Sequence, residues 1–291
     1  MLPEWIFYFV RREQFRVEAK RNFTGTAGQQ RVPTSFLQSA MIPVPPLSEQ
    51  RRIVDLFSRA ESIVRLRREA QKKAAELIPA LFTDLFGDPA TNPKGWPVSE
   101  LGDSLAEPPT LGTMAKPSKE QAAWLDLRVA NIQGGLLTLK DKRWLDLPSA
   151  QEQRFALRDG DLILARAIGS LDHLGKAVVV NTYGAKWTFD SHLMRVRLNN
   201  SKLLPEFLKY FFESPGGRQE FLKHTRRSAG QFNINGTELR RIRCGIPPLQ
   251  RQLAFQSVVA DVDSLAAQQV TASTQAEATF NALLAQVFAP V

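Results

Sequence analysis

Cysteine and histidine are scarce in this chain of 291 residues, which has one cysteine, Cys244, and three histidines. A single cysteine excludes a disulfide within the chain and fits a reducing cytoplasm, where we expect the protein. We interpret Cys244 as a buried residue of a strand-like run. His173, His192 and His224 lack a second histidine or cysteine at metal-ligand spacing, so the sequence predicts no metal site. His192 is interpreted as a core histidine within a strand.

Catalytic signatures are also missing. The chain has no Gly-x-Gly-x-x-Gly fingerprint and no P-loop. It also lacks the Asn-Pro-Pro-aromatic motif of adenine methyltransferases. Asp159 and Asp161 flank a glycine, but no lysine stands where a nuclease needs one. The sequence therefore predicts a chain that is not an enzyme.

Long hydrophobic runs are absent as well. The apolar run at residues 5–10 is too short for a signal peptide or a membrane segment, and Arg11 and Arg12 follow it at once. We therefore expect no membrane partner. Hydrophobic residues still make up 43% of the chain, which is typical of a folded protein.

Acidic residues are outnumbered by basic ones, 29 to 38, which gives a net charge of +9. Such a balance favours a polyanionic partner, nucleic acid before a membrane surface. Many globular proteins are mildly basic, however, so the charge alone does not decide the function.

The chain contains one long repeat. The stretch Ile-Pro-Val-Pro-Pro-Leu-Ser-Glu-Gln from Ile42 returns as Cys-Gly-Ile-Pro-Pro-Leu-Gln-Arg-Gln from Cys244. At this offset of 202 positions, residues 2–89 align with 204–291 without a gap and share 21 identities in 88 positions. A period this long indicates duplicated domains rather than a solenoid. Residues 5–10 match residues deep inside the chain, so we expect the chain to start in the middle of a domain.

Each copy predicts the same local structure. An amphipathic helix opens after Leu-Pro-Glu, and a basic loop and a short strand lead to the Pro-Pro turn. Beyond the turn, apolar residues recur at helical spacing over 48–86 and 250–288. Ser48 is a plausible N-cap, Pro79 should kink the first long helix, and Gly87 should end it. The charges of the two helices are +2 and −2, which favours packing against each other in coiled-coil style. The alternative is that each helix packs on a separate partner.

Between the long helices lies a domain of different texture. Strands are predicted at 125–132, 161–166, 176–180 and 192–198, and helices at 205–213 and 216–224. The fold class is therefore α+β: a domain with a β core, plus two long helices packed as an antiparallel coiled-coil-like pair.

These motifs together resemble the specificity subunit of type I restriction-modification systems. That family alternates target-recognition domains with long helices, each preceded by Pro-Pro-Leu-x-Glu-Gln. Residues 45–50 fit this motif fully, whereas residues 247–252 have Arg251 at the acidic position. The junctions at 86–89 and 92–97 also match, as do the runs at 127–132, 160–163, 174–176 and 191–193. The resemblance covers essentially the whole chain, with the first recognition domain apparently truncated at its N-terminal side.

The resemblance implies five segments. They are a remnant of a first target-recognition domain (1–46), a spacer helix (47–87), a linker (88–95), a complete target-recognition domain (96–247) and a second spacer helix (248–291). It also implies a function, the sequence-specific recognition of a half-site in double-stranded DNA. The expected partners are methyltransferase subunits and a nuclease–translocase subunit, with a second half-specificity chain as a further candidate. S-adenosylmethionine, ATP and Mg are expected on those partners and no cofactor on this chain.

If the chain reads DNA, the loop at 224–235 is the first candidate, because arginine and amide side chains read bases and contact phosphates. Alternating polar residues there would share one face of an extended segment. The predicted DNA contacts are Arg226, Arg227, Gln231, Asn233, Asn235, Lys116, Lys119, Lys140, Lys142, Arg143 and Arg166. The alternative for the loop is a solvated hairpin whose asparagines make turns, and the other cations could equally be ordinary surface charges.

The two turns before the long helices are candidate subunit contacts, although a purely structural role as helix starts is at least as well supported. The residues are Pro45, Pro46, Leu47, Glu49, Gln50, Pro247, Pro248, Leu249 and Gln252. The alternative function is a truncated assembly protein that keeps the helix scaffold and lacks productive DNA recognition.

Overall fold

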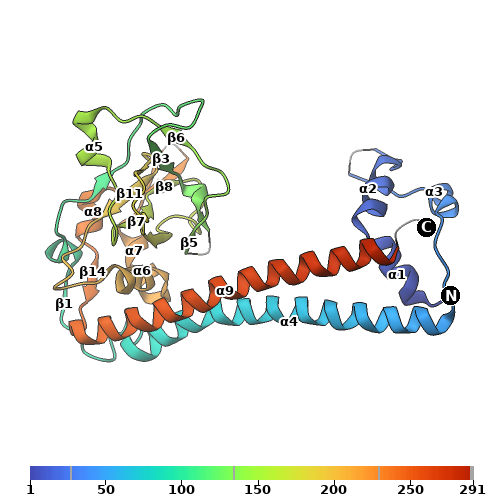
Figure 1. The fold of residues 1–291 in the computed structure, drawn as a ribbon. Coiled ribbons are helices and arrows are strands. Elements are labelled where there is room, and N and C mark those ends of the chain that lie inside the picture. Colours follow the sequence, from blue (N-terminus) through green and yellow to red (C-terminus); the bar gives the residue numbers. More distant parts are fainter. Residues whose placement is uncertain (27, 134, 229, 289–291) are drawn as a thin grey trace. The chain divides into compact units, whose positions relative to one another are not determined.

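The computed structural model describes residues 1–26, 28–133, 135–228 and 230–288, and its helices and strands form an α+β fold (Figure 1). The chain divides into two compact units. Unit 1 comprises Met1–Ala75 and Val262–Val291, and unit 2 comprises Glu76–Asp261. Among the described residues, no helix is both long enough and apolar enough to cross a membrane.

Two long helices, α4 (Leu47–Phe86) and α9 (Leu249–Val287), each contribute to both units. The Pro46 carbonyl accepts hydrogen bonds from the Glu49 and Gln50 amides at 3.0 Å, so α4 already begins before Ser48. The prediction of Ser48 as the N-cap is therefore wrong. Helix α4 continues through Pro79. It ends, as predicted, before Gly87, which has a φ of 80°. A β-carbon at Gly87 would lie 2.6 Å from the Pro93 ring, so the turn requires glycine.

The long helices pack against each other in antiparallel fashion. In unit 1, the Phe57 ring lies 6.1 Å from both the Phe280 and the Phe288 rings. In unit 2, Phe82 on the last part of α4 packs 5.7 Å from Phe255 near the start of α9. The predicted antiparallel pair is confirmed, because its apolar stripes face each other in each unit.

In unit 1, three short helices cover the long ones: α1 (Pro3–Arg11), α2 (Glu13–Arg21) and α3 (Thr34–Ser39). Their apolar faces form a core with α4 and α9, in which Trp5 lies 4.5 Å from Phe288. The Trp5 indole also donates to the Pro43 carbonyl at 2.8 Å. The amphipathic helix predicted from Leu-Pro-Glu is thus confirmed.

The short strand predicted before Pro45 is wrong, since residues 40–46 form neither helix nor strand. The second copy explains the difference. There β14 (Arg243–Gly245) exists because β1 (Val98–Glu100) pairs with it antiparallel. Residues 41–43 have no equivalent of β1 among the described residues of unit 1, and an isolated strand cannot satisfy its backbone groups.

Two of the sheets in unit 2 supply most of its hydrophobic core. One has the order β2 (Thr110–Leu111), β11 (Leu193–Val196), β7 (Leu162–Ala165), β9 (Ala177–Val179), all antiparallel. The other has the order β10 (Trp187–Phe189), β3 (Trp124–Leu127), β6 (Trp144–Leu145). Their inward residues form one hydrophobic core with Ile163, Phe189 and Leu193 fully buried. The β core is therefore confirmed.

The predicted strand at 125–132 is too long. It ends at Leu127 and is followed by the 3-10 helix η2 (Val129–Asn131) and the hairpin β4 (Ile132–Gln133) and β5 (Leu136–Leu137). The remaining helices are η1 (Leu101–Ser104), α5 (Ser149–Phe155), α6 (Pro205–Glu213), α7 (Pro215–Lys223) and α8 (Gly236–Arg240). Cys244 is buried in β14 as predicted, and burial raises the pKa of its thiol.

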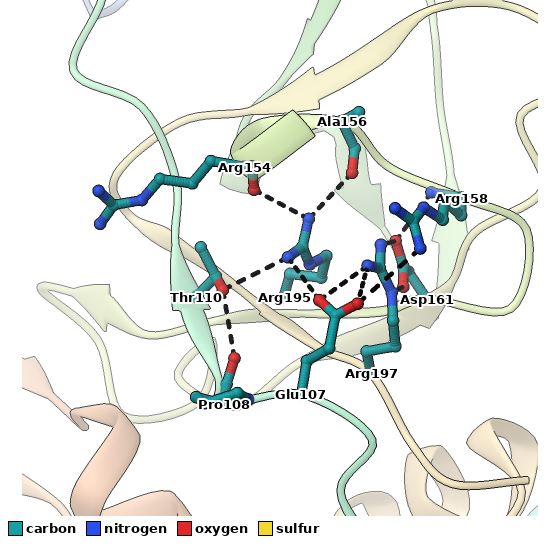
Figure 2. A network of polar contacts seen from close by, with 9 residues as sticks. All are labelled: Glu107, Pro108, Thr110, Arg154, Ala156, Arg158, Asp161, Arg195 and Arg197. Carbon is teal, nitrogen blue, oxygen red and sulfur yellow. Dashed lines mark hydrogen bonds and ion pairs between the residues drawn. The ribbon is translucent and has the colours of Figure 1, made fainter. Parts of the chain in front are cut away.

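A network of charged residues ties the segment before β2 to the central strands (Figure 2). Arg197 donates two hydrogen bonds to the buried carboxylate of Asp161, at 2.7 and 2.8 Å, and two to Glu107 at 2.8 Å. Arg195, 4% exposed, donates to the carbonyls of Arg154 and Ala156. The hydrogen bonds from Arg197 hold the pKa of Glu107 below its usual range. The network therefore fixes the framework that carries the candidate site.

Candidate nucleic-acid interface

The loop predicted to contact DNA folds as a hairpin on a third small sheet. Strand β12 (Arg226–Ser228) pairs with β13 (Gln231–Asn233), which pairs with β8 (Ala167–Ile168), both antiparallel. Ile234, which directly follows β13, is 1% exposed and anchors the hairpin to the core. Gly230 has a φ of 78°, a conformation that suits the turn of a hairpin.

The register of this sheet gives the hairpin two chemically different faces. Directly opposite residues project to the same side of a sheet. Gln231 and Asn233 therefore share one side with their partners Ser228 and Arg226. The predicted alternation of Gln231 and Asn233 is confirmed.

The other side of the hairpin carries Arg227 and Phe232. The Arg227 guanidinium lies 5.4 Å from the Phe232 ring, a cation–π contact that orients an exposed cation. Arg227 is exposed.

Asn235 does not continue this pattern. Its side chain accepts a hydrogen bond from the Glu238 amide at 2.9 Å and caps α8, so the turn interpretation is right for this residue. Arg226 is also engaged, because its guanidinium forms an ion pair with Glu238, although its side chain stays 69% exposed.

Gln231 lies at the edge of a shallow pocket in unit 2. The pocket is lined by the end of β3, by η2, by β8, by β13 and by the turn before β11. Its lining residues include Arg128, Gly169, Asp190, His192 and Gln231. We call this depression the Gln231 pocket. It brings one amide, one guanidinium and one imidazole to one place, which is a donor and acceptor set suited to base edges.

Arg128 and His192 were not among the predicted contacts. Arg128 donates to the Asp141 carbonyl at 3.1 Å, while its Nε is buried without a hydrogen-bond partner among the described residues. His192 is not a core histidine: its side chain is 51% exposed, in the turn before β11. That prediction is wrong because the strand starts one residue later, at Leu193. The neighbouring Asp190 and Ser191 were the available turn signal.

Arg143 and Arg166 are tied into the framework. The Arg143 Nε donates to Asp126 at 2.5 Å and an Nη to Asp190 at 3.4 Å. Asp126 is 2% exposed, and burial raises its pKa to about 6 although Arg143 opposes the shift. An Arg166 Nη donates to the Ser191 carbonyl at 3.1 Å, and burial lowers the pKa of Arg166. Both arginines therefore have internal partners that the sequence did not reveal.

The four predicted lysines are exposed, as expected for loop residues. Lys116 and Lys119 lie in an irregular segment after β2, and Lys140 and Lys142 lie between β5 and β6. Within the parts of unit 2 that the structure describes, no carboxylate forms an ion pair with any of the four. Their charges are thus available to a polyanion.

The two Pro-Pro-Leu turns form a repeated clamp. The Gln252 Oε1 accepts from the Leu204 amide at 2.8 Å, and its Nε2 donates to the Pro247 and Lys202 carbonyls. Gln50 repeats this with the Leu2 amide at 2.9 Å and the Pro45 carbonyl at 2.7 Å. Gln50 is 1% exposed and Gln252 is 0% exposed, so both side chains are buried with their internal partners.

The rest of the turns differs in exposure. Pro46, Leu47 and Pro248 are exposed, Pro45, Glu49 and Leu249 are half-buried, and Pro247 is buried. Surface is thus available for a partner at Pro46, Leu47 and Pro248. The two glutamines join each long helix to the start of α1 or α6.

The carboxylates that could have suggested catalysis have structural partners. Asp159 accepts from the amide and hydroxyl of Thr182 at 2.7 Å, and Asp161 is the buried partner of Arg197 (Figure 2). Across residues 1–26, 28–133, 135–228 and 230–288, no group of three or more His, Cys, Asp or Glu could hold a metal ion.

No protein-family model matches the chain. Among curated proteins, the specificity subunit of the type I restriction enzyme StySPI from Salmonella potsdam is 24% identical over 303 residues, covering 98% of this chain and 65% of the relative. The EcoKI specificity subunit from Escherichia coli K12 is 26% identical over 236 residues, covering 76% of this chain and 50% of the relative. The chain thus spans about half to two thirds of the length of these relatives.

Solved structures show the same fold. The S subunit of a type I restriction-modification system from M. genitalium superposes with a TM-score of 0.57 at 15% identity, over 99% of this chain and 73% of that one. Both relatives are specificity subunits of type I restriction enzymes. Along nearly its whole length, the chain is similar to a specificity subunit of a type I restriction enzyme.

Proposed function

We propose that the chain is a DNA sequence-specificity subunit and that unit 2 reads duplex DNA through the β12–β13 hairpin and the Gln231 pocket. The observation that carries the proposal is that Gln231, which shares a face of the hairpin with Asn233, lines a pocket with Arg128 and His192. The chain that carries this pocket is similar to specificity subunits. Amide side chains that reach a base edge can make two hydrogen bonds to adenine, and guanidinium groups to guanine.

The exposed cations would supply the sequence-independent part of binding. Lys116, Lys119, Lys140 and Lys142 are loop residues without carboxylate partners in the described part of unit 2, and the whole chain carries a net charge of +9. Contacts of this kind neutralise phosphates and release counterions, so they strengthen binding to every sequence alike.

The long helices would dock methyltransferase subunits, which bind S-adenosylmethionine, and a nuclease–translocase subunit that uses ATP and Mg would join them. The support is a set of apolar side chains that both helices leave exposed and that a partner could cover. On α4 they include Leu56, Ile63, Leu66 and Leu77, and on α9 Leu253, Leu265 and Val270.

Selection of bound sequences from a random pool of DNA duplexes tests the reading role. The purified chain, with methyltransferase subunits from the same system, should enrich one half-site motif. Gln231→Ala should then reduce the preference for one base pair of that motif by about 1–3 kcal/mol, as for one lost bidentate contact.

Gln121→Ala is the matched control, because Gln121 is an exposed loop glutamine outside the hairpin and the pocket. Its motif and affinity should equal those of the wild type. A chain that enriches no motif, or a Gln231→Ala variant with an unchanged motif, would show that this hairpin does not read DNA.

A further inference from the structure

One carboxylate lies at the foot of the β12–β13 hairpin with basic residues around it. The Glu238 Oε1 accepts a hydrogen bond from an Arg226 Nη at 2.5 Å. The Glu238 Oε2 lies 3.9 Å from the His224 Nδ1 and 3.9 Å from an Arg241 Nη. Only 12% of the Glu238 side chain is exposed, so these neighbours compensate its charge more than water does.

The framework of unit 2 holds Glu238 in this place. Its amide donates to the Asn235 side chain at 2.9 Å, and the next residue, Leu239, is fully buried. Helix α8, which carries Glu238 and Leu239, packs against η1. Arg226, in contrast, has a side chain that is 69% exposed. The ion pair therefore ties an exposed guanidinium to a fixed carboxylate.

Arg226 belongs to the face of the hairpin that carries Gln231 and Asn233. It lies opposite Asn233 in the pairing of β12 with β13, so the two side chains project to one side. A guanidinium in this position could bind either a base edge or a phosphate of DNA. Glu238 gives this guanidinium a counter-charge within the chain.

The counter-charge affects the two kinds of DNA contact unequally. A phosphate is attracted to a free guanidinium whatever the base sequence. The Glu238 carboxylate neutralises Arg226 and would repel a phosphate that approached the pair. A base edge carries no net charge, so the same carboxylate opposes a base contact far less. Glu238 therefore disfavours the contact that is independent of sequence and permits the one that depends on it.

We propose that Glu238 is a positioning residue that sets the specificity of the hairpin, because its carboxylate withholds Arg226 from DNA phosphates. In this role Glu238 acts through Arg226 and does not itself touch DNA. Its effect is to weaken binding to duplexes of unrelated sequence, which raises the ratio of specific to non-specific affinity. The inference rests on the proposed function in taking the hairpin as a DNA-binding element.

The salt dependence of binding to a random-sequence duplex tests the inference. Fluorescence anisotropy of the labelled duplex is measured with the full chain at several salt concentrations, for the wild type, Glu238→Gln, Arg226→Ala and the double variant. Glu220→Gln is the matched control, since it removes the same charge from another side chain that is mostly buried. The ion-pair partners of Glu220 are Lys223 and His224 rather than Arg226.

Glu238→Gln should free Arg226 for one more phosphate contact. Its affinity for the random duplex should rise about five-fold at about 0.1 M salt, and the magnitude of the logarithmic salt slope should increase by about 0.9. Glu220→Gln should leave the slope unchanged. Arg226→Ala in the wild-type chain should also leave it unchanged, because Arg226 binds no phosphate there. In the double variant the gain should disappear.

A second probe is the half-site duplex enriched from the random pool. Glu238→Gln should gain less affinity for this duplex than for the random one, so the ratio of the two affinities should fall about three-fold or more. Urea unfolding shows whether each variant is folded. Arg226→Ala in the wild-type chain leaves Glu238 in place, so its salt slope decides the matter if Glu238→Gln does not fold.

An unchanged slope in a folded Glu238→Gln variant would overturn the inference, as would a slope that Arg226→Ala reduces in the wild-type chain. A gain that persists in the double variant would also overturn it, since Glu238 would then act without Arg226. Binding to the random duplex needs no half-site. These outcomes are therefore separate from a failure of the chain to enrich a motif, which would refute the proposed function.

Discussion

At the scale of single residues, charge is used in two ways that the sequence does not distinguish. Arg143 and Lys142 are neighbours in the chain and both were predicted to contact DNA. The lysine is exposed, while the arginine reaches the buried carboxylate of Asp126. Partners far apart in sequence decide this outcome, so local composition could predict the basic loops and not which cation is free.

Asp126 should make the stability of the chain depend on pH. Its folded pKa of about 6 lies above the ordinary 3.8, so the folded state binds the proton more tightly. The resulting stabilisation is complete below about pH 4 and is lost as the pH rises through about 6. The unfolding free energy of the wild type minus that of Asp126→Asn should fall by up to about 3 kcal/mol between pH 4 and 7. Urea unfolding at several pH values measures it.

Asp159→Asn is the control of opposite sign. Hydrogen bonds from Thr182 lower the pKa of Asp159, so the advantage of the wild type should be present above about pH 4 and be lost below it. If the Asp126→Asn difference is constant with pH, Asp126 is ionised throughout and its burial is compensated.

The glutamine clamp predicts a stability effect at one conserved position of the repeat within this chain. Gln252→Ala leaves the buried Leu204 amide and the Pro247 carbonyl without that partner. The unfolding free energy should fall by about 1–3 kcal/mol. Gln250→Ala, an exposed neighbour on the same helix, should change it by less than about 0.5 kcal/mol. A stable Gln252→Ala variant that fails to bind methyltransferase subunits would favour a subunit contact instead.

At the scale of elements, the periodicity of apolar residues predicted both long helices and their antiparallel pairing. Helices carry their hydrogen bonds within themselves, so the local sequence suffices. The strand before Pro45 failed for the opposite reason: its second copy is a strand only because Val98–Glu100 pairs with it. The Gln231 pocket could not be predicted either, since it assembles four segments that lie far apart in sequence.

The helix pair should depend on its aromatic residues more than on its charges. Phe57 is fully buried against Tyr8, Phe280 and Phe288, so Phe57→Ala should lower the unfolding free energy by about 3–5 kcal/mol. Arg68 pairs with Glu277 at 2.8 Å but is 66% exposed, and Arg68→Ala should cost at most about 1 kcal/mol. Chemical unfolding of the two variants compares them, and a larger effect of Arg68→Ala would contradict this order.

At the scale of the whole molecule, a net charge of +9 and the exposed loop lysines of unit 2 predict the salt dependence of DNA binding. Affinity should fall linearly on a logarithmic salt scale, with a slope set by the number of neutralised phosphates. If Lys140 and Lys142 each contact a phosphate, replacing both with alanine should reduce the magnitude of the slope by about 2 and weaken all sequences alike.

Lys72→Ala/Lys73→Ala is the matched control, since it removes the same charge from exposed positions on α4. Its slope should equal that of the wild type if binding is local to unit 2. Affinities measured by fluorescence anisotropy at several salt concentrations separate the two variants. Equal slopes for both would mean that the net charge attracts DNA without local contacts, whereas a change limited to one DNA sequence would place Lys140 and Lys142 at base edges rather than at phosphates.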